Sequence, residues 1–229
     1  MNRMAPEGVS VHATRMRLEG AMSPESYARM AEDAAAGASL LRTARVDVIA
    51  YACTSGAILE DSGRLTETIE REGGVPAVTT ARAVVEALRA LGLRRIAVGT
   101  PYVAFVNEAE RLFLEKAGFE VTRMRGLEMG KTPESRVAIG RLKREAVHDL
   151  ARQVDSPEAE GVFLSCLNMA ALDLLDRLEG ELGKPVLSST VATFWAALRR
   201  TGVEVSIPGF GSFLREFPPL PEPAGTRPS

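Results

Sequence analysis

Short apolar runs rich in valine and isoleucine alternate along this chain with longer amphipathic stretches, and this alternation limits the possible folds more than any other feature. Buried strands of a parallel sheet read as continuous apolar runs, and a crossover helix must separate each strand from the next. The pattern therefore predicts an α/β fold of parallel sheets flanked by helices. We expect strands at 9–17, 46–52, 76–79, 95–99, 119–125, 161–165 and 185–187. We expect helices at 24–42, 61–72, 80–91, 102–117, 134–153, 168–182 and 190–201.

A buried strand that ends in a cysteine occurs twice, at 48–56 and at 161–169. In each half a second strand and helix follow in the same order, at 74–92 and 183–202. This repeat predicts two pseudo-symmetric lobes with an active site in the cleft between them, although chance similarity of βα units would leave the same trace. We place the first lobe at 1–92 with 186–217, the second lobe at 93–185, and a disordered proline-rich tail at 218–229.

The composition argues against several classes of protein. The net charge of −2 gives no reason to expect nucleic acid as a partner. No apolar run approaches the roughly 18 residues that cross a bilayer, and the N-terminus lacks a secretory signal, so we expect a cytoplasmic protein without a membrane partner. Two cysteines in 229 residues make no disulfide framework. Metal-ligand spacings and glycine-rich phosphate loops are missing too, which predicts a site without metal or cofactor.

Cys53 and Cys166 each stand at the carboxyl end of a predicted strand. Ligands of open α/β sheets bind outside these strand ends, so the two thiols are expected to face one pocket from opposite sides. A helix start beside each sulfur would stabilise a thiolate and lower its pKa toward neutrality. The alternatives are that both cysteines are small buried apolar residues, or that they form a structural disulfide.

Small and polar residues follow both cysteines. Thr54 and Ser55 offer hydroxyls and backbone donors, and Leu167-Asn168 offers backbone donors and one side-chain amide. Turns at 79–80 and 188–190 join a strand to a helix, where anions bind, and Tyr102 begins a helix after another strand. Each of these residues can equally be a helix cap or ordinary packing. Together they predict a pocket for a small carboxylic acid.

The residues around the two cysteines resemble the aspartate/glutamate racemase superfamily, in particular its maleate cis-trans isomerase and arylmalonate decarboxylase branch. The resemblance covers about 9–202, and its motifs are Ala52-Cys53-Thr54-Ser55-Gly56, Ser165-Cys166-Leu167-Asn168, Thr100-Pro101-Tyr102-Val103 with Asn107, and the segment 183–189 with Trp195. It implies a two-lobed α/β fold, no metal or organic cofactor, small carboxylic acid substrates, and a homodimer or homotetramer. Decarboxylases of this branch look as if they carry glycine at the position of Cys53, so two cysteines favour isomerase or racemase chemistry.

The resemblance also implies roles for the residues. Cys53 would be the nucleophile and Cys166 its proton-handling partner, while Tyr102 and the Thr54-Ser55 amides would hold carboxylates. In the isomerase mode a thiolate adds to a double bond, the adduct rotates and elimination gives the trans acid. In the alternative racemase mode, acting on an amino acid or a hydantoin, one cysteine removes an α-proton and the other delivers one. A third possibility is a non-catalytic ligand-binding homologue.

Three departures from the branch bear on the substrate. An N-terminal strand and a Ser-Asn-Thr turn, which members of the branch look as if they carry, are missing before residue 9, either truly or through a start codon assigned too late. No asparagine stands near Ser135-Arg136, where the branch places a second substrate amide, and Leu167 replaces a small polar residue. We expect the basic run from Arg136 to Arg144 to be a solvated helix face.

Overall fold

The computed structural model describes residues 1–221, and two parallel sheets form its centre. The smaller sheet pairs β1 (Ile49–Tyr51) with β2 (Ala77–Thr79). The larger sheet has the order β4-β3-β5-β6, with bounds Glu120–Gly126, Arg95–Thr100, Gly161–Leu164 and Val186–Ser188. All recorded pairings are parallel, which confirms the predicted fold class. The carboxyl ends of β1 and β5 lead directly to Cys53 and Cys166.

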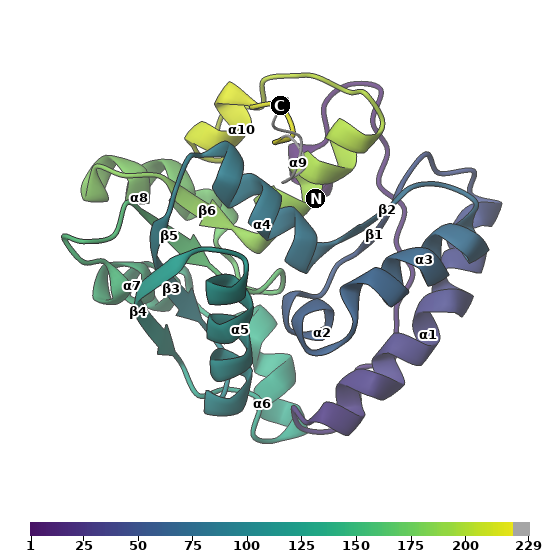
Figure 1. Ribbon diagram of the computed structural model, residues 1–229, viewed down its shortest axis with the longest axis horizontal. Coiled ribbons are helices and arrows are strands. Elements are labelled where there is room, and N and C mark those ends of the chain that lie inside the picture. The colour runs from purple at the N-terminus through teal and green to yellow at the C-terminus, as the bar shows by residue number, and fades with distance from the viewer. Residues whose placement is uncertain (222–229) are drawn as a thin grey trace, which may run out of the picture.

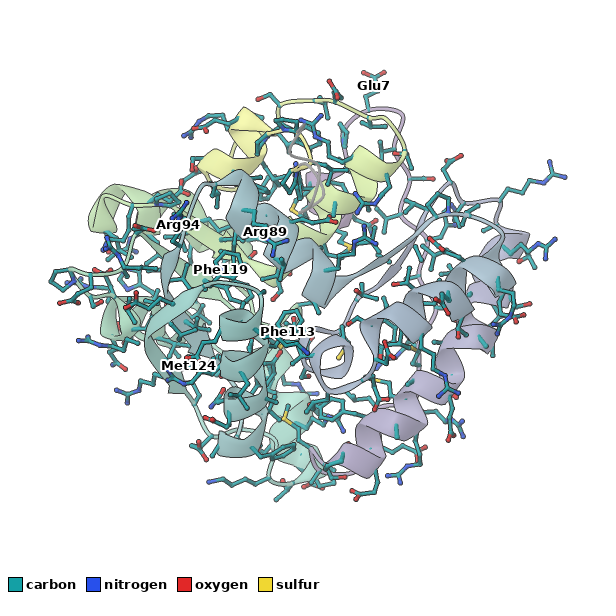
Figure 2. The ribbon with its side chains drawn as sticks, in the orientation of Figure 1. Glu7, Arg89, Arg94, Phe113, Phe119 and Met124 are labelled. Atoms are coloured by element: carbon teal, nitrogen blue, oxygen red, sulfur yellow. The ribbon has the colours of Figure 1, made fainter. Side chains whose placement is uncertain are left out.

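Helices cover both sheets (Figure 1). α1 (Pro24–Thr43) and α3 (Ser62–Gly73) lie beside the smaller sheet, whereas α7 (Arg144–Val154) and α8 (Leu175–Leu182) lie on the far side of the larger one. α4 (Thr80–Ala90) packs against α9 (Ser189–Arg200), and short α2 (Thr54–Leu59) packs against α5 (Ala104–Lys116). Figure 2 shows the labelled Phe113 of α5 near the middle of the molecule, where α5 faces α2. No helix within residues 1–221 is long and apolar enough to cross a membrane.

Local sequence explains where the longest helix begins. Ser23 is the N-cap of α1: its side chain accepts a hydrogen bond from Ser26 N, and the Ser23 backbone N–H donates to the Ser26 hydroxyl oxygen. This reciprocal arrangement satisfies two backbone donors that a helix start otherwise leaves free. Pro24 fills the first helical position, where a missing N–H costs nothing.

The strand predicted at 9–17 is wrong. This segment forms no ladder with a neighbouring strand, and a strand exists only when a partner takes its backbone hydrogen bonds. The segment is held instead by the Asp33 side chain of α1. The Arg17 backbone N donates to this carboxylate at 2.8 Å, and the Arg17 guanidinium pairs with it too. Alternating apolar residues alone do not reveal whether a neighbouring strand is present.

Two predicted helices are shorter or interrupted. The stretch 134–153 divides into α6 (Pro133–Ala138), a 3-10 turn η2 (Ile139–Arg141) and α7, because the backbone extends at Leu142 and Lys143. The helix predicted from 168 begins only with the 3-10 turn η3 (Leu172–Leu174), after an irregular loop that contains Cys166. Three short elements were not predicted: α2, α10 (Ser212–Glu216) and the 3-10 turn η1 (Asn2–Met4).

The proposed lobe boundaries do not coincide with the division of the strands into two sheets. β6 hydrogen bonds to β5, so this strand belongs to the larger sheet although the boundary at 185/186 assigns it to the first lobe. α9, which follows, packs against α4 and β2. Of the predicted tail, 222–229 lies outside the described residues. Pro218 accepts a hydrogen bond from Trp195 at 2.8 Å, and Leu220 packs against the core.

Candidate active site

Both cysteines border one cavity of about 1000 Å³. All the residues predicted for the site line it: Cys53, Thr54, Ser55, Tyr102, Cys166, Leu167 and Asn168. Cys53 is partly buried and Cys166 is buried, and neither is in a disulfide. The structure therefore brings together residues that lie more than a hundred positions apart in the chain. Their chemical roles stay predictions, but their common location is a structural fact.

Cys53 is the N-cap of α2. Its sulfur accepts a hydrogen bond from Gly56 N at 3.4 Å and lies 3.8 Å from the Ser55 hydroxyl oxygen. Gly56 permits this approach, because a Cβ at that position would lie 2.6 Å from Met30 Cε and 3.2 Å from the sulfur itself. A backbone donor aimed at the sulfur stabilises its ionised form more than its neutral form.

Cys166 stands in a strained turn after β5, with φ of 115°. Side chains rarely adopt this conformation, so the surrounding contacts must hold it in place. Its backbone N donates to the Ser189 hydroxyl at 3.1 Å, and the Tyr102 phenol lies beside its sulfur. The backbone stays irregular after this turn, and the helix expected from 168 begins only at η3.

Both thiols have raised pKa values, contrary to the expectation from sequence. Burial raises the pKa of Cys53, while the Gly56 N–H, Ser55 and the charge of Arg136 oppose this rise. Burial also raises the pKa of Cys166, to about 11, against the effect of the Tyr102 hydroxyl and of the Asn168 backbone. Helix dipoles act over a single turn, whereas desolvation penalises the whole thiolate charge. At both sulfurs desolvation therefore outweighs the nearby donors, and the pKa lies above that of a free thiol.

A hydroxyl links the two halves of the site. Thr54, next to Cys53, donates to the Ser189 oxygen at 2.9 Å, and the same oxygen accepts the Cys166 N–H. The Thr193 hydroxyl of α9 donates to the backbone carbonyl of Ser189 at 2.8 Å and is hydrogen bonded to the Thr80 hydroxyl. Ser189 thus fixes the turn at Cys166 to the start of α2. From the sequence, Ser189 is expected only as part of an anion-binding turn.

The predicted anion turns at 79–80 and 188–189 do not line the cavity. Thr80 donates to Tyr51 O at 3.0 Å, and Ser188 caps α9 by accepting from Val191 N. Only Thr190 of this group borders the cavity. The hydroxyls are used to hold the frame, because buried polar groups need partners inside the protein.

Tyr102 and Asn168 are held by their surroundings. The Tyr102 N–H donates to Thr100 Oγ1 at 3.0 Å, and Asn107 Nδ2 donates to Tyr102 O at 3.1 Å. Asn168 is exposed at the rim and lies against Gly140, where a Cβ would lie 2.9 Å from Asn168 Nδ2. The missing side chain at Gly140, in η2, therefore leaves room for Asn168.

The sequence did not predict three buried polar side chains that line the cavity: Tyr27, Tyr51 and Arg136. Arg136 was expected on a solvated face, but it is only 3% exposed and its guanidinium lies 4.9 Å from the Tyr27 ring centre. A weak signal existed, because Arg136 shares a helical face with apolar Ile139 three positions later. The hydroxyls of Tyr27 and Tyr51 are buried, and the described residues supply neither with a hydrogen-bond partner.

Comparison with known proteins places this geometry in a family context. A family model described as arylmalonate decarboxylase matches residues 2–214. The maleate isomerase of Nocardia farcinica is 33% identical over 90% of this chain and 84% of its own, and the arylmalonate decarboxylase of Bordetella bronchiseptica is 32% identical over 86% and 83%.

Solved structures agree with the sequence matches. A maleate isomerase from Pseudomonas putida with maleate has a TM-score of 0.84 and 29% identity, covering 93% of this chain and 87% of that one. A cysteine-to-serine mutant of the Nocardia farcinica maleate cis-trans isomerase with a covalently bound succinylcysteine intermediate also has a TM-score of 0.84, with 31% identity and coverage of 92% and 89%.

Proposed function

We propose, from the premise that this chain belongs to the arylmalonate decarboxylase family, that it is a cofactor-independent cis-trans isomerase of a small unsaturated dicarboxylic acid such as maleate. The observation that carries the proposal is the pair of free cysteines on one cavity. A related isomerase holds its substrate carbons on a cysteine as a succinyl adduct, so this chemistry is available to the fold. The relatives named for isomerisation are also similar over most of the chain.

The reaction can be followed atom by atom. The Cys53 thiolate forms a C–S bond to one alkene carbon, and the electron pair moves onto the neighbouring carbon. Cys166 donates its proton to that carbon, which gives a succinyl adduct with a freely rotating C–C bond. After rotation, Cys166 takes a proton back, the C–S bond breaks, and the trans acid leaves with Cys53 restored as thiolate.

The electrostatics support this division of roles. The Gly56 N–H, the Ser55 hydroxyl and the Arg136 charge all favour ionisation of Cys53. Cys166, with a pKa of about 11, holds its proton and is suited to deliver it to a carbanion. We assign the carboxylate next to the reacting carbons to the backbone N–H groups of Thr54 and Ser55, the Ser55 hydroxyl and Tyr102, all of which line the cavity.

Proton NMR of maleate in deuterated water tests the proposal. We expect the maleate vinyl signal to be replaced by that of fumarate, and Cys53→Ser to abolish this change. Deuterium incorporation at the α-carbon of an amino acid, with maleate unchanged, would instead support the racemase alternative. Loss of carbon dioxide from an arylmalonate without isomerisation would assign the decarboxylase reaction.

A further inference from the structure

Arg136 is a buried cation in a place where a solvated one was expected. It is 3% exposed, and it comes from α6, which lies near the start of α1 in Figure 1. Its Nη1 donates to the carbonyls of Glu19 and Ala21 and to the Ser26 hydroxyl, at 3.1 to 3.4 Å. No carboxylate of residues 1–221 is among its partners, and its buried Nη2 has no partner in that part of the chain.

An unpaired buried guanidinium is costly, because it loses water without gaining a counter-charge. The face of the Tyr27 ring, 4.9 Å away, offsets part of this cost. Neutral carbonyls and a ring do not neutralise the charge, however. Arginine offers two parallel N–H donors that match the two oxygens of a carboxylate, and a buried arginine without an acid is suited to receive one from a ligand.

The position of Arg136 relative to the cysteines shows which ligand that is. Arg136 lines the same cavity as Cys53 and Cys166. Its charge acts on Cys53 and on the phenols of Tyr27 and Tyr51, so it lies on the Cys53 side of the site. Asp47 is the one carboxylate among the described lining residues, and it stands before β1, at the strand end opposite to Cys53.

We propose that Arg136 binds the second carboxylate of a dicarboxylic acid and thereby makes the site selective for dianions over monoanions. The inference rests on the proposed function for the identity of the site, but it concerns recognition and not turnover. The donors around Thr54, Ser55 and Tyr102 hold the carboxylate next to the reacting carbons. The guanidinium then pairs with the remote one through Nη2, which the N-terminal contacts leave available.

Binding of succinate tests this proposal without any reaction, because succinate has two carboxylates and no double bond. Calorimetry should show that the protein binds succinate more tightly than butyrate, which has the same carbon chain length and one carboxylate. We expect Arg136→Gln to weaken succinate binding roughly 10- to 100-fold, as befits the loss of a charge-assisted hydrogen bond. The ratio of the two Kd values should fall by a similar factor. The control is Arg141→Gln, which removes an exposed charge of the same region and should leave both affinities unchanged.

Three results would overturn the proposal. One is a protein that shows no preference for succinate over butyrate, which requires no variant and so holds even if Arg136→Gln fails to fold. Another is a folded Arg136→Gln that retains its succinate affinity. The third is an equal loss of affinity for succinate and for butyrate in Arg136→Gln, which would show that Arg136 only shapes the cavity. An Arg136-dependent affinity for succinate in a protein that does not isomerise maleate would uphold this inference and refute the proposed function.

Discussion

The two cysteine-bearing strand ends echo each other in sequence but differ in structure. After β1, Cys53 caps a short helix, and its sulfur accepts the Gly56 N–H at 3.4 Å. After β5, Cys166 enters a strained turn with φ of 115°, and its backbone is fixed by the Ser189 hydroxyl. At Cys53 a backbone N–H donates to the sulfur, whereas at Cys166 the backbone N–H donates to Ser189 and the Tyr102 hydroxyl lies beside the sulfur.

This difference teaches that pseudo-symmetry of sequence need not give two equal bases. A racemase needs each thiol to remove or deliver a proton in turn, so it benefits from two similar environments. Here Cys53 has the Arg136 charge and a backbone donor beside it, while Cys166 has the Tyr102 phenol and a pKa of about 11. The asymmetry favours one nucleophile and one proton carrier, as addition and elimination require.

Replacing the cysteines should give the largest effects. We expect Cys53→Ser and Cys166→Ser each to lower kcat for maleate isomerisation by at least about a thousandfold, because each removes a group that touches the reacting atoms. The two variants should nevertheless differ. Intact-protein mass spectrometry after incubation with maleate should detect an adduct on Cys166→Ser and none on Cys53→Ser. An adduct on Cys53→Ser alone would reverse the assigned roles.

The pH dependence of alkylation by iodoacetamide should show the next largest effect. Burial raises the pKa of Cys53, so below that pKa the thiolate fraction falls about tenfold for each pH unit. Labelling of Cys53 should therefore rise roughly a hundredfold between pH 6 and pH 8 and continue to rise above the ordinary range of a free thiol. Peptide mapping should place the first label on Cys53 at every pH. A plateau at or below neutrality, or first labelling of Cys166, would contradict the comparison.

Gly56→Ala should weaken the Cys53 half selectively. The added Cβ would lie 2.6 Å from Met30 Cε, 2.9 Å from Tyr51 Oη and 3.2 Å from the Cys53 sulfur. We expect the free energy of unfolding to fall by about 1–3 kcal/mol, and kcat to fall by roughly tenfold as the sulfur is pushed from its donor. The control is Gly180→Ala, whose Cβ meets nothing within 4 Å in a helix and should stabilise the fold by about 0.5–1 kcal/mol. Thermal unfolding and steady-state kinetics separate the two substitutions.

Ser189→Ala should give the smallest effect, and it tests the Cys166 half. Removing the hydroxyl leaves the buried Cys166 N–H and the Thr54 hydroxyl without their acceptor, which costs about 1–3 kcal/mol in stability. We expect a drop of a few-fold in kcat with KM nearly unchanged, since the turn at Cys166 becomes less well fixed. Ser188→Ala removes the cap of α9 and not the contact to Cys166, so it should lower Tm while kcat is retained. Equal kinetic effects of the two variants would show that Ser189 only stabilises the helix.

Much of the fold was predictable because local signals were strong. Runs such as Arg95–Thr100 and Gly161–Leu164 combine apolar character with flanking helices, and both are strands as expected. Ser23 and Pro24 specified a helix start by a local hydrogen-bond pattern. The segment 9–17 failed because strand formation depends on a partner, and the chain itself does not say whether a neighbour lies within reach.

The sequence by itself determined the parallel α/β fold and the placement of both cysteines at strand ends, because the spacing of apolar residues within each segment indicates a strand or a helix. The tertiary structure decided the electrostatics of the site. Whether a thiol ionises, or a basic residue such as Arg136 is solvated, depends on burial and on groups that arrive from distant elements. Desolvation is a property of the assembled interior, so no stretch of the chain carries it alone.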